Sequence, residues 1–165
     1  MKKMNLFAGL FSIPALLLLA SCTGHYWKGA DIGWATEYEA DGQYFCNADG
    51  ERRECTELMK ELGLDAVRFR VWVDPSRHGN WNGSEDLLVK AKRARDLDMA
   101  VMVDFHYSDF WADPKKQNIP ASWSGKPYEE IRELLSQHTV DVLKMLKDND
   151  INPKDYGFEK ISWMK

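Results

Sequence analysis

The sequence predicts an α/β fold in which parallel strands alternate with helices. Residues 66–73 and 99–106 are rich in β-branched, aromatic and other apolar residues, a composition typical of strands. The apolar run within 99–106 indicates a strand that is buried on both faces, as in parallel sheets. Apolar residues with helical spacing lie between and after these segments, and βαβ units of this size form parallel sheets with right-handed crossovers.

The first predicted strand covers residues 27–35 (WKGADIGWA), and the first predicted helix covers residues 51–62. Asp49 has the residue type of an N-cap, and Gly63 is the expected stop of this helix. Four apolar residues of the helix fall on one face: Cys55, Leu58, Met59 and Leu62.

The second predicted strand covers residues 66–73 (AVRFRVWV), and Ser84 is expected to cap the helix that follows it. The third strand covers residues 99–106 (MAVMVDFH), and Pro127 stands where the third helix is expected to begin. His138 falls on the apolar face of this third helix, where we expect it to have a structural role.

Two parallel architectures fit this order, namely an open doubly wound sheet and a (β/α)₈ barrel. No Gly-x-Gly-x-x-Gly or Walker motif follows any strand, so nucleotide binding has no support. A complete barrel needs about 250 residues, and this chain would hold about three of its eight βα units. In such a partial barrel both the strand at 99–106 and the strand at 27–35 would be unpaired edges.

The amino-acid composition argues against some classes of ligand and favours others. The formal net charge of −4 argues against a nucleic-acid partner, which usually selects a basic surface. Aromatic residues make up 12% of the chain, with seven Trp, and this richness favours carbohydrate or another ring-shaped ligand. Three cysteines are too few for a disulfide scaffold. Cys46 and Cys55 could pair in an oxidising compartment, or Cys55 could be an ordinary buried apolar residue.

The N-terminal segment has the pattern of a secretory signal. Two lysines precede residues 6–20, which are mostly apolar and too short to span a membrane. The sequence Leu19-Ala20-Ser21-Cys22 resembles a bacterial lipobox, so we expect residues 1–21 to be removed and Cys22 to carry lipid. Thr23 then favours the bacterial outer membrane or cell surface. The alternative is an ordinary signal peptide that is cut after a small residue.

Polar residues on the second and third strands follow the two-residue period of a strand. Arg68, Arg70 and Trp72 share one face, and Asp104 and His106 share one face of their own strand. Inside a barrel, two neighbouring arginines would need acidic partners. The loop after the third strand is rich in aromatic and acidic residues, and such loops at strand ends build barrel active sites.

Four segments carry a family resemblance: residues 29–32 (GADI), 67–72 (VRFRVW), 91–94 (AKRA) and 104–117 (DFHYSDFWADPKKQ). They resemble the arabinogalactan endo-β-1,4-galactanases of glycoside hydrolase family 53. The resemblance covers about residues 28–151 and implies the N-terminal part of a (β/α)₈ TIM barrel. It also implies hydrolysis of β-1,4-galactan with retention, without a metal or other cofactor. Residues 22–151 are therefore assigned to a partial barrel.

The resemblance assigns site residues one by one. Arg68 matches an arginine that orients the nucleophile and keeps it ionised, and His106 matches a histidine near the sugar at the cleavage point. Asp31, Trp72 and Trp111 are expected to line the same cleft. Alternative interpretations are that Arg68 is a structural ion-pair partner of Asp104 and that His106 is a packed core histidine.

The two catalytic glutamates of the family have no match in this chain. The acid/base follows a pattern like Val-Gly-Asn-Glu at strand four, whereas Glu159 lacks the preceding Asn, and the nucleophile belongs to strand seven. Residues 152–165 therefore form a divergent tail, which we interpret as truncated or frameshifted. The alternative function is an inactive fragment or a surface lipoprotein that binds glycan without cleaving it.

A metal-dependent hydrolase is a further alternative. Asp104, His106, Asp109 and His78 have side chains that suit divalent ions, although no HExxH or repeated His-x-His spacing accompanies them.

Overall fold

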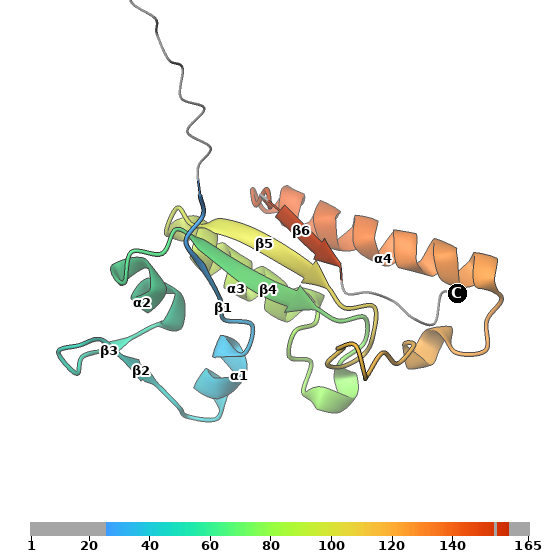
Figure 1. The fold of residues 1–165 in the computed structure, drawn as a ribbon, viewed down its shortest axis with the longest axis horizontal. Helices are drawn as coiled ribbons and strands as arrows, with labels where there is room; N and C mark the ends of the chain where they lie inside the picture. Colours follow the sequence, from blue (N-terminus) through green and yellow to red (C-terminus); the bar gives the residue numbers. More distant parts are fainter. Residues whose placement is uncertain (1–25, 154, 159–165) are drawn as a thin grey trace, which may run out of the picture.

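The computed structural model describes residues 26–153 and 155–158 (Figure 1). In this part of the chain, the main sheet has four parallel strands in the order β1-β4-β5-β6. Helices α3 (Ser84–Asp96) and α4 (Tyr128–Asp148) lie behind one face of the sheet (Figure 1). The strands are β1 (Gly29–Asp31), β4 (Ala66–Val71), β5 (Ala100–Phe105) and β6 (Asp155–Phe158). The predicted α/β fold with a parallel sheet is confirmed.

Smaller elements fill the connections between the strands. A short hairpin precedes α2, and single 3₁₀ turns lie in the loops after β4 and β5. These elements are α1 (Ala35–Ala40), β2 (Phe45–Cys46), β3 (Arg52–Arg53), α2 (Cys55–Glu61), η1 (Ser76–His78) and η2 (Ala121–Trp123).

The predicted helix over 51–62 begins four residues late. The side-chain oxygen of Asn47 accepts hydrogen bonds from the backbone N–H groups of Asp49, at 3.1 Å, and Glu51, at 2.9 Å. This local bonding closes the β2–β3 hairpin and competes with helix formation. The N-cap is therefore Glu54, whose carboxylate accepts from the first turn of α2, and not Asp49. Gly63, at φ +84°, ends the helix as predicted.

Three further sequence expectations need correction. The strand predicted over 27–35 is only β1, because the Asp31 carboxylate accepts the N–H of Gly33 at 3.1 Å and turns the chain. Ser84 is the first residue of α3 rather than its cap, since Gly83 holds the N-cap position without a side-chain bond. Leu62 lies past the end of α2 and is 65% exposed, so it does not share the buried face.

The hydrophobic core lies between the sheet and the two long helices. Alternate residues of β4 and β5 point to the helices and are buried, as the two-residue period requires. Core residues include Val67, Phe69, Val71, Val101, Val103 and Phe105 from the strands and Leu87, Ala91, Ala94, Val142 and Leu146 from the helices. The residues between them on each strand face the opposite, inner side of the sheet.

The strand β5 is not an edge. Residues 102–105 of β5 pair in parallel register with residues 155–158 of β6, so the predicted unpaired edge at the third strand is wrong. Strand β6 lies in the segment 152–165 that the sequence analysis assigned to a divergent tail. Backbone pairing uses N–H and C=O groups that every non-proline residue carries, so a departure from the family's side-chain pattern does not prevent it.

Cys55 and His138 are both packed side chains. Cys46 is exposed and Cys55 is buried, and both are free thiols. Burial raises the pKa of Cys55 to about 11, and the nearby carboxylate of Glu54 adds to this effect. His138 packs edge-on against Phe105, with ring centroids 6.1 Å apart, and burial lowers its pKa.

Cys22, the signal segment 1–21 and Glu159 lie outside the described residues. Within residues 26–153 and 155–158, no helix combines the length and the apolar character that crossing a membrane requires.

Helix α4 offers a matched pair of substitutions that tests the core. Leu146 is fully buried and Val140 is 54% exposed on the same helix. Leu146→Ala should lower the free energy of unfolding by about 2–5 kcal/mol, because it removes buried methyl groups and leaves a cavity. Val140→Ala should change it by less than about 0.5 kcal/mol. Urea denaturation followed by circular dichroism measures both, and equal losses would contradict this placement of α4.

Candidate active site

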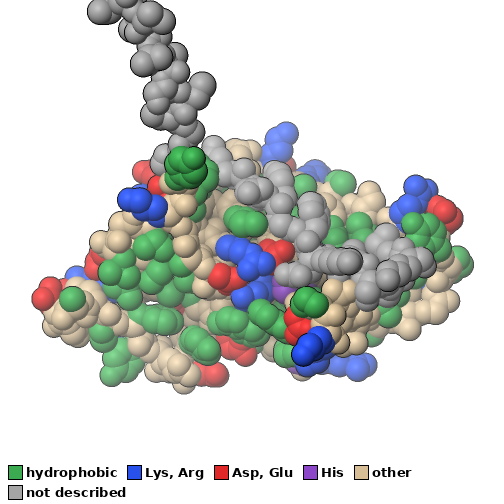
Figure 2. Space-filling model, in the orientation of Figure 1, with side chains coloured by type: hydrophobic (Ala, Val, Ile, Leu, Met, Phe, Trp, Pro, Cys, Tyr) green, Lys and Arg blue, Asp and Glu red, His purple; other side chains and the backbone are tan. Residues whose placement is uncertain are grey.

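Charged side chains gather on the inner face of the sheet, toward the carboxyl ends of β1, β4 and β5. The strand register places Asp31 beside Arg68 and Arg70 beside Asp104. Figure 2 shows basic and acidic side chains next to one another near the middle of this face, with a histidine beside them. Because active sites of α/β barrels form at the carboxyl ends of the strands, this cluster is the candidate active site.

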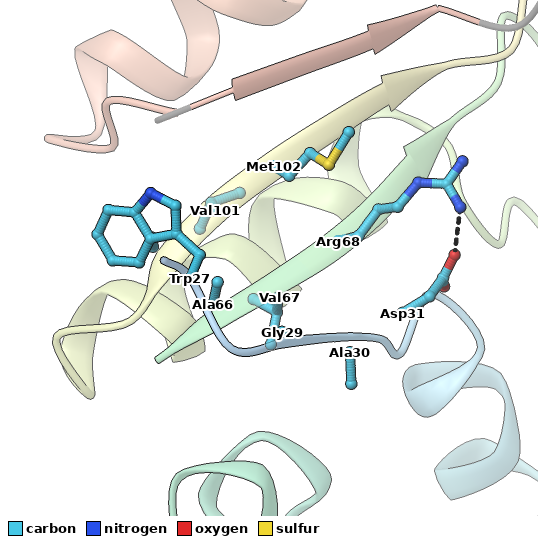
Figure 3. A pocket seen from close by; sticks show the side chains of 10 residues that line it. Trp27, Gly29, Ala30, Asp31, Ala66, Val67, Arg68, Val101 and Met102 are labelled. Carbon is cyan, nitrogen blue, oxygen red and sulfur yellow. Dashed lines mark hydrogen bonds and ion pairs between the residues drawn. The ribbon is translucent and has the colours of Figure 1, made fainter. Parts of the chain in front are cut away.

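Two arginines are held by two aspartates. Arg68 donates to Asp31 at 3.0 Å (Figure 3) and also forms an ion pair with Asp104. Arg70 donates to the same oxygen of Asp31 at 2.7 Å. Arg70 and Asp104 are 8% and 2% exposed in their side chains, whereas Arg68 keeps 35%. Arg68 is thus the arginine that presents its guanidinium to the inner face.

Arg70 lies under aromatic rings. Its guanidinium carbon is 4.6 Å from the ring centre of Trp111 and 5.6 Å from that of Trp34, distances at which cation–π attraction operates. Gly33 makes room for it, because a Cβ at this position would stand 2.8 Å from a guanidinium nitrogen of Arg70. The turn after β1 therefore needs glycine for packing, without a positive φ.

His106 is buried, at 1% exposure, and both its ring nitrogens have partners. Nδ1 accepts from the indole N–H of Trp72 and from the backbone N–H of Ala112, each at 3.3 Å. Nδ1 therefore carries no proton, and we assign the proton to Nε2, which lies 3.1 Å from the Asp104 carboxylate. In this arrangement Nε2 of His106 donates to the Asp104 carboxylate.

Asp104 is an ionised carboxylate within this network. Burial alone raises the pKa of Asp104, but the hydrogen bond from His106 and the charge of Arg68 lower it by more. The net pKa of Asp104 lies below its usual value. A buried carboxylate of this kind stays charged because its neighbours donate to it.

The structure thus brings together the residues that the sequence singled out. Asp31 contacts Arg68 directly, and His106 reaches Arg68 through their shared partner Asp104. Trp72 is buried beneath the cluster and bonds His106, while Trp111 is half-buried above Arg70. Arg68 does pair with Asp104, as its alternative interpretation held, and 35% of its side chain is exposed. That these side chains bind sugar remains a prediction.

Of the four residues of the metal alternative, Asp104 and His106 contact each other, whereas Asp109 and His78 have other partners. The Asp109 carboxylate accepts backbone N–H groups of Asp74 and Ala121, at 3.0 and 2.8 Å. His78 packs against Phe110, with ring centroids 4.1 Å apart and ring planes tilted by 31°. Over the described ranges, no group of three or more His, Cys, Asp or Glu side chains is placed to hold a metal ion.

Sequence reasoning missed a buried lysine behind the site. Lys90 of α3 is 1% exposed and donates to the carbonyl of Gly33 at 2.8 Å, to the side chain of Asn82 at 3.0 Å and to Asp86 at 2.6 Å. Burial lowers the pKa of Lys90, and the Asp86 carboxylate opposes that shift. The sequence feature that could have indicated this burial is the position of Lys90 between the apolar residues Leu87 and Ala91 of the helix.

Asp104→Asn tests the charge network. At pH 7 the variant should be about 1–3 kcal/mol less stable, because Arg68 and His106 lose a charged acceptor. The pKa of Asp104 is lowered on folding, from about 3.9 in the unfolded chain, so the carboxylate's contribution is complete above about pH 5. That contribution disappears as the pH falls below about 4 and through the folded pKa. Urea denaturation of both proteins between pH 7 and pH 3 should show the difference shrinking, and a constant difference would refute it.

Comparison with known proteins places the chain in a family. Residues 27–156 match the family described as glycosyl hydrolase family 53. The endo-β-1,4-galactanase of Bacillus subtilis (strain 168) is 37% identical over 140 residues, which are 80% of this chain and 33% of that protein. The arabinogalactan endo-β-1,4-galactanase A of Aspergillus niger is 36% identical over 143 residues, which are 85% of this chain and 39% of that protein.

Solved structures agree with this match. A fungal β-1,4-galactanase superposes with a TM-score of 0.73 at 30% identity, over 79% of this chain and 38% of that one. The catalytic domain from Ignisphaera aggregans gives the same TM-score and identity over 78% and 38%. The chain spans between a third and two fifths of the curated relatives described here. Of the two architectures left open by the sequence, the fold is the N-terminal part of a TIM barrel, and the chain belongs to glycosyl hydrolase family 53.

Proposed function

We propose that this chain forms the first part of an endo-acting β-1,4-galactanase and binds β-1,4-galactan, the side chain of arabinogalactan, on its inner face. The observation that carries the proposal is the charge network of Asp31, Arg68, Asp104 and His106 at the carboxyl ends of three adjacent parallel strands. Family membership and the names of the relatives as galactanases support the same substrate.

Arg68 is the residue to which we assign the interaction with the nucleophile. Retaining hydrolysis uses a carboxylate nucleophile about 5 Å from the acid/base carboxyl. A guanidinium beside the nucleophile keeps it ionised and orients it by charge-assisted hydrogen bonds. Arg68 suits this role because Asp31 and Asp104 fix it from two sides while 35% of its side chain stays accessible.

Of the other site residues, one is assigned to contact with the sugar and the rest to positioning the charged side chains. Trp111 is half-buried over Arg70, and we assign to it the apolar contact with a galactosyl ring. Trp72 and His106 are buried, and the ring nitrogens of His106 bond protein groups. We therefore assign these two to positioning: His106 orients Asp104, and Asp104 orients Arg68. Asp31 positions both arginines.

These 165 residues alone should bind galactan and not cleave it, because neither family glutamate has a matching position. Affinity electrophoresis in gels with β-1,4-galactan should show retardation of the purified chain, with no release of galacto-oligosaccharides in an assay free of host glycosidases. Trp111→Ala should abolish the retardation by removing the apolar contact. Trp27→Ala is the matched control, since Trp27 lies before β1 at the opposite end of the strands (Figure 3).

Two outcomes would contradict this proposal. Galacto-oligosaccharide release that Glu159→Gln abolishes would make Glu159 the acid/base and the chain an enzyme. Migration unaffected by galactan would remove the binding role. Retardation without release is also the result expected for the second candidate function, a surface glycan-binding protein without catalysis. The observation that favours this candidate is a charge network that already joins β1, β4 and β5.

We further propose that the protein is a bacterial outer-membrane or cell-surface lipoprotein attached through Cys22. The Leu19-Ala20-Ser21-Cys22 sequence supports this proposal. A multiply acylated cysteine anchors a protein stably, whereas one chain binds marginally. Mass spectrometry of the mature protein should find lipid on Cys22, and Cys22→Ser should yield unmodified protein that is lost from the membrane fraction. An unmodified N-terminus in the wild type would end this proposal.

A further inference from the structure

The ammonium group of Lys90 is buried in the helix layer, and the proposed function does not use it. It donates to the carbonyl of Gly33 at 2.8 Å, to the side-chain oxygen of Asn82 at 3.0 Å and to the carboxylate of Asp86 at 2.6 Å. Asp86 lies one turn earlier on α3, whereas Gly33 belongs to the turn after β1 and Asn82 to the loop after β4. A buried ammonium group needs an acceptor for each N–H, so Lys90 joins three segments at one point.

One path of hydrogen bonds leads from Lys90 to the inner face through the turn after β1. The N–H of Gly33 donates to one carboxylate oxygen of Asp31 at 3.1 Å, and the other oxygen accepts from Arg68 at 3.0 Å. Glycine has no Cβ to restrict its φ and ψ angles, so its N–H direction needs an external anchor. The bond from Lys90 to the Gly33 carbonyl is such an anchor.

A second path leads from the same ammonium group through the loop after β4. The backbone carbonyl of Asn82 accepts the backbone N–H of Trp72 at 2.8 Å. The indole N–H of Trp72 donates to Nδ1 of His106 at 3.3 Å. Nε2 of His106 lies 3.1 Å from the carboxylate of Asp104, which forms an ion pair with Arg68. The two paths therefore end on the two carboxylates that hold one guanidinium.

The packing of α3 does not require a charge at this position. The helix already contacts the core through Leu87, Ala91 and Ala94, all fully buried. Replacing a buried ion pair by apolar side chains of similar volume is often neutral or stabilising, so we expect the pair of Lys90 and Asp86 to contribute little to stability. The ammonium group does fix directions, because its donors must point at their acceptors.

We propose that Lys90 is a positioning residue, which sets the orientation of the Arg68 guanidinium from the helix layer through Asp31 and through Asp104. Lys90 is 1% exposed and acts without contact with the sugar. The proposal rests on the proposed function in one respect, namely that Arg68 faces the ligand. It adds that this orientation depends on one side chain of α3.

The test follows three N–H signals of the purified 165-residue chain in ¹H–¹⁵N NMR spectra: the backbone of Gly33, the indole of Trp72 and the guanidinium of Arg68. Lys90→Met keeps an unbranched side chain but removes the donors, and it should shift all three signals. It should also raise the galactan concentration for half-maximal retardation about 5-fold, the equivalent of one hydrogen bond of about 1 kcal/mol.

Two control variants separate positioning from a general loss of stability. Lys92→Met changes the same residue type two positions along α3, outside both paths, and should leave the three signals and the retardation unchanged. Leu146→Ala destabilises the core through α4 and should also leave both readouts unchanged while the protein is folded. The same shifts in Leu146→Ala would show that any loosening of the fold moves Arg68, and would overturn the proposal.

A second variant breaks only one path. Asn82 has φ +59°, which glycine adopts readily, so Asn82→Gly keeps the backbone carbonyl and removes the side-chain acceptor of Lys90. It should shift the signals of Trp72 and Arg68 and leave that of Gly33 in place. If Lys90→Met does not fold, this variant decides, and unchanged Trp72 and Arg68 signals overturn the proposal.

The remaining outcomes separate this proposal from the proposed function. Unchanged Arg68 and Trp72 signals in folded Lys90→Met overturn the positioning role. Shifted signals with unchanged retardation also overturn it, because the orientation of Arg68 would then not matter for the ligand. A wild-type chain that galactan does not retard refutes the proposed function, whereas shifts of all three signals in Lys90→Met would still support the positioning of Arg68.

Discussion

The buried carboxylate of Asp104 is the constraint on which the inner face depends. An ionised carboxylate at 2% exposure is costly unless its oxygens accept from charged or well-placed donors. Arg68 on β4 and His106 at the end of β5 supply those donors. Arg68 in turn reaches Asp31 on β1, so side-chain bonds cross the same strands that the backbone ladder joins. One desolvated charge thereby fixes the orientation of groups on three strands.

The inner face changes character along the strands. Toward their amino ends it carries small residues, Gly29, Ala66 and Ala100, around an apolar hollow of about 300 Å³ (Figure 3). Toward their carboxyl ends the same face carries Arg68 and Asp104. The alternation within each strand that sends valine and phenylalanine to the helices sends these residues inward. The apolar core residues thus lie on the opposite face of the sheet from the charged residues. On the inner face, the charged residues lie only toward the carboxyl ends of the strands.

Much of this arrangement was predictable from the sequence, because it follows from periodicity. The common face of Arg68 and Arg70 is a consequence of their spacing, and the start of β4 at Ala66 follows from its composition. Two features were not predictable. The turn bonds of Asn47 displaced the start of α2, since local side-chain bonding and helix formation compete at similar energies. The role of Lys90 depends on contacts across 57 residues of sequence, which periodicity does not encode.

Lys90 shows how the helix layer reaches the site. Its ammonium group donates a hydrogen bond to the carbonyl of Gly33, and the N–H of Gly33 donates to the carboxylate of Asp31. The guanidinium of Arg70 occupies the space that a Cβ at Gly33 would need. The turn after β1 is therefore fixed on its outer side by a helix and on its inner side by the charge cluster. Because a buried ammonium group must keep its acceptors, any movement of α3 would strain this turn. The position of the two arginines is consequently set by the outer layer of the barrel as well as by their own strand.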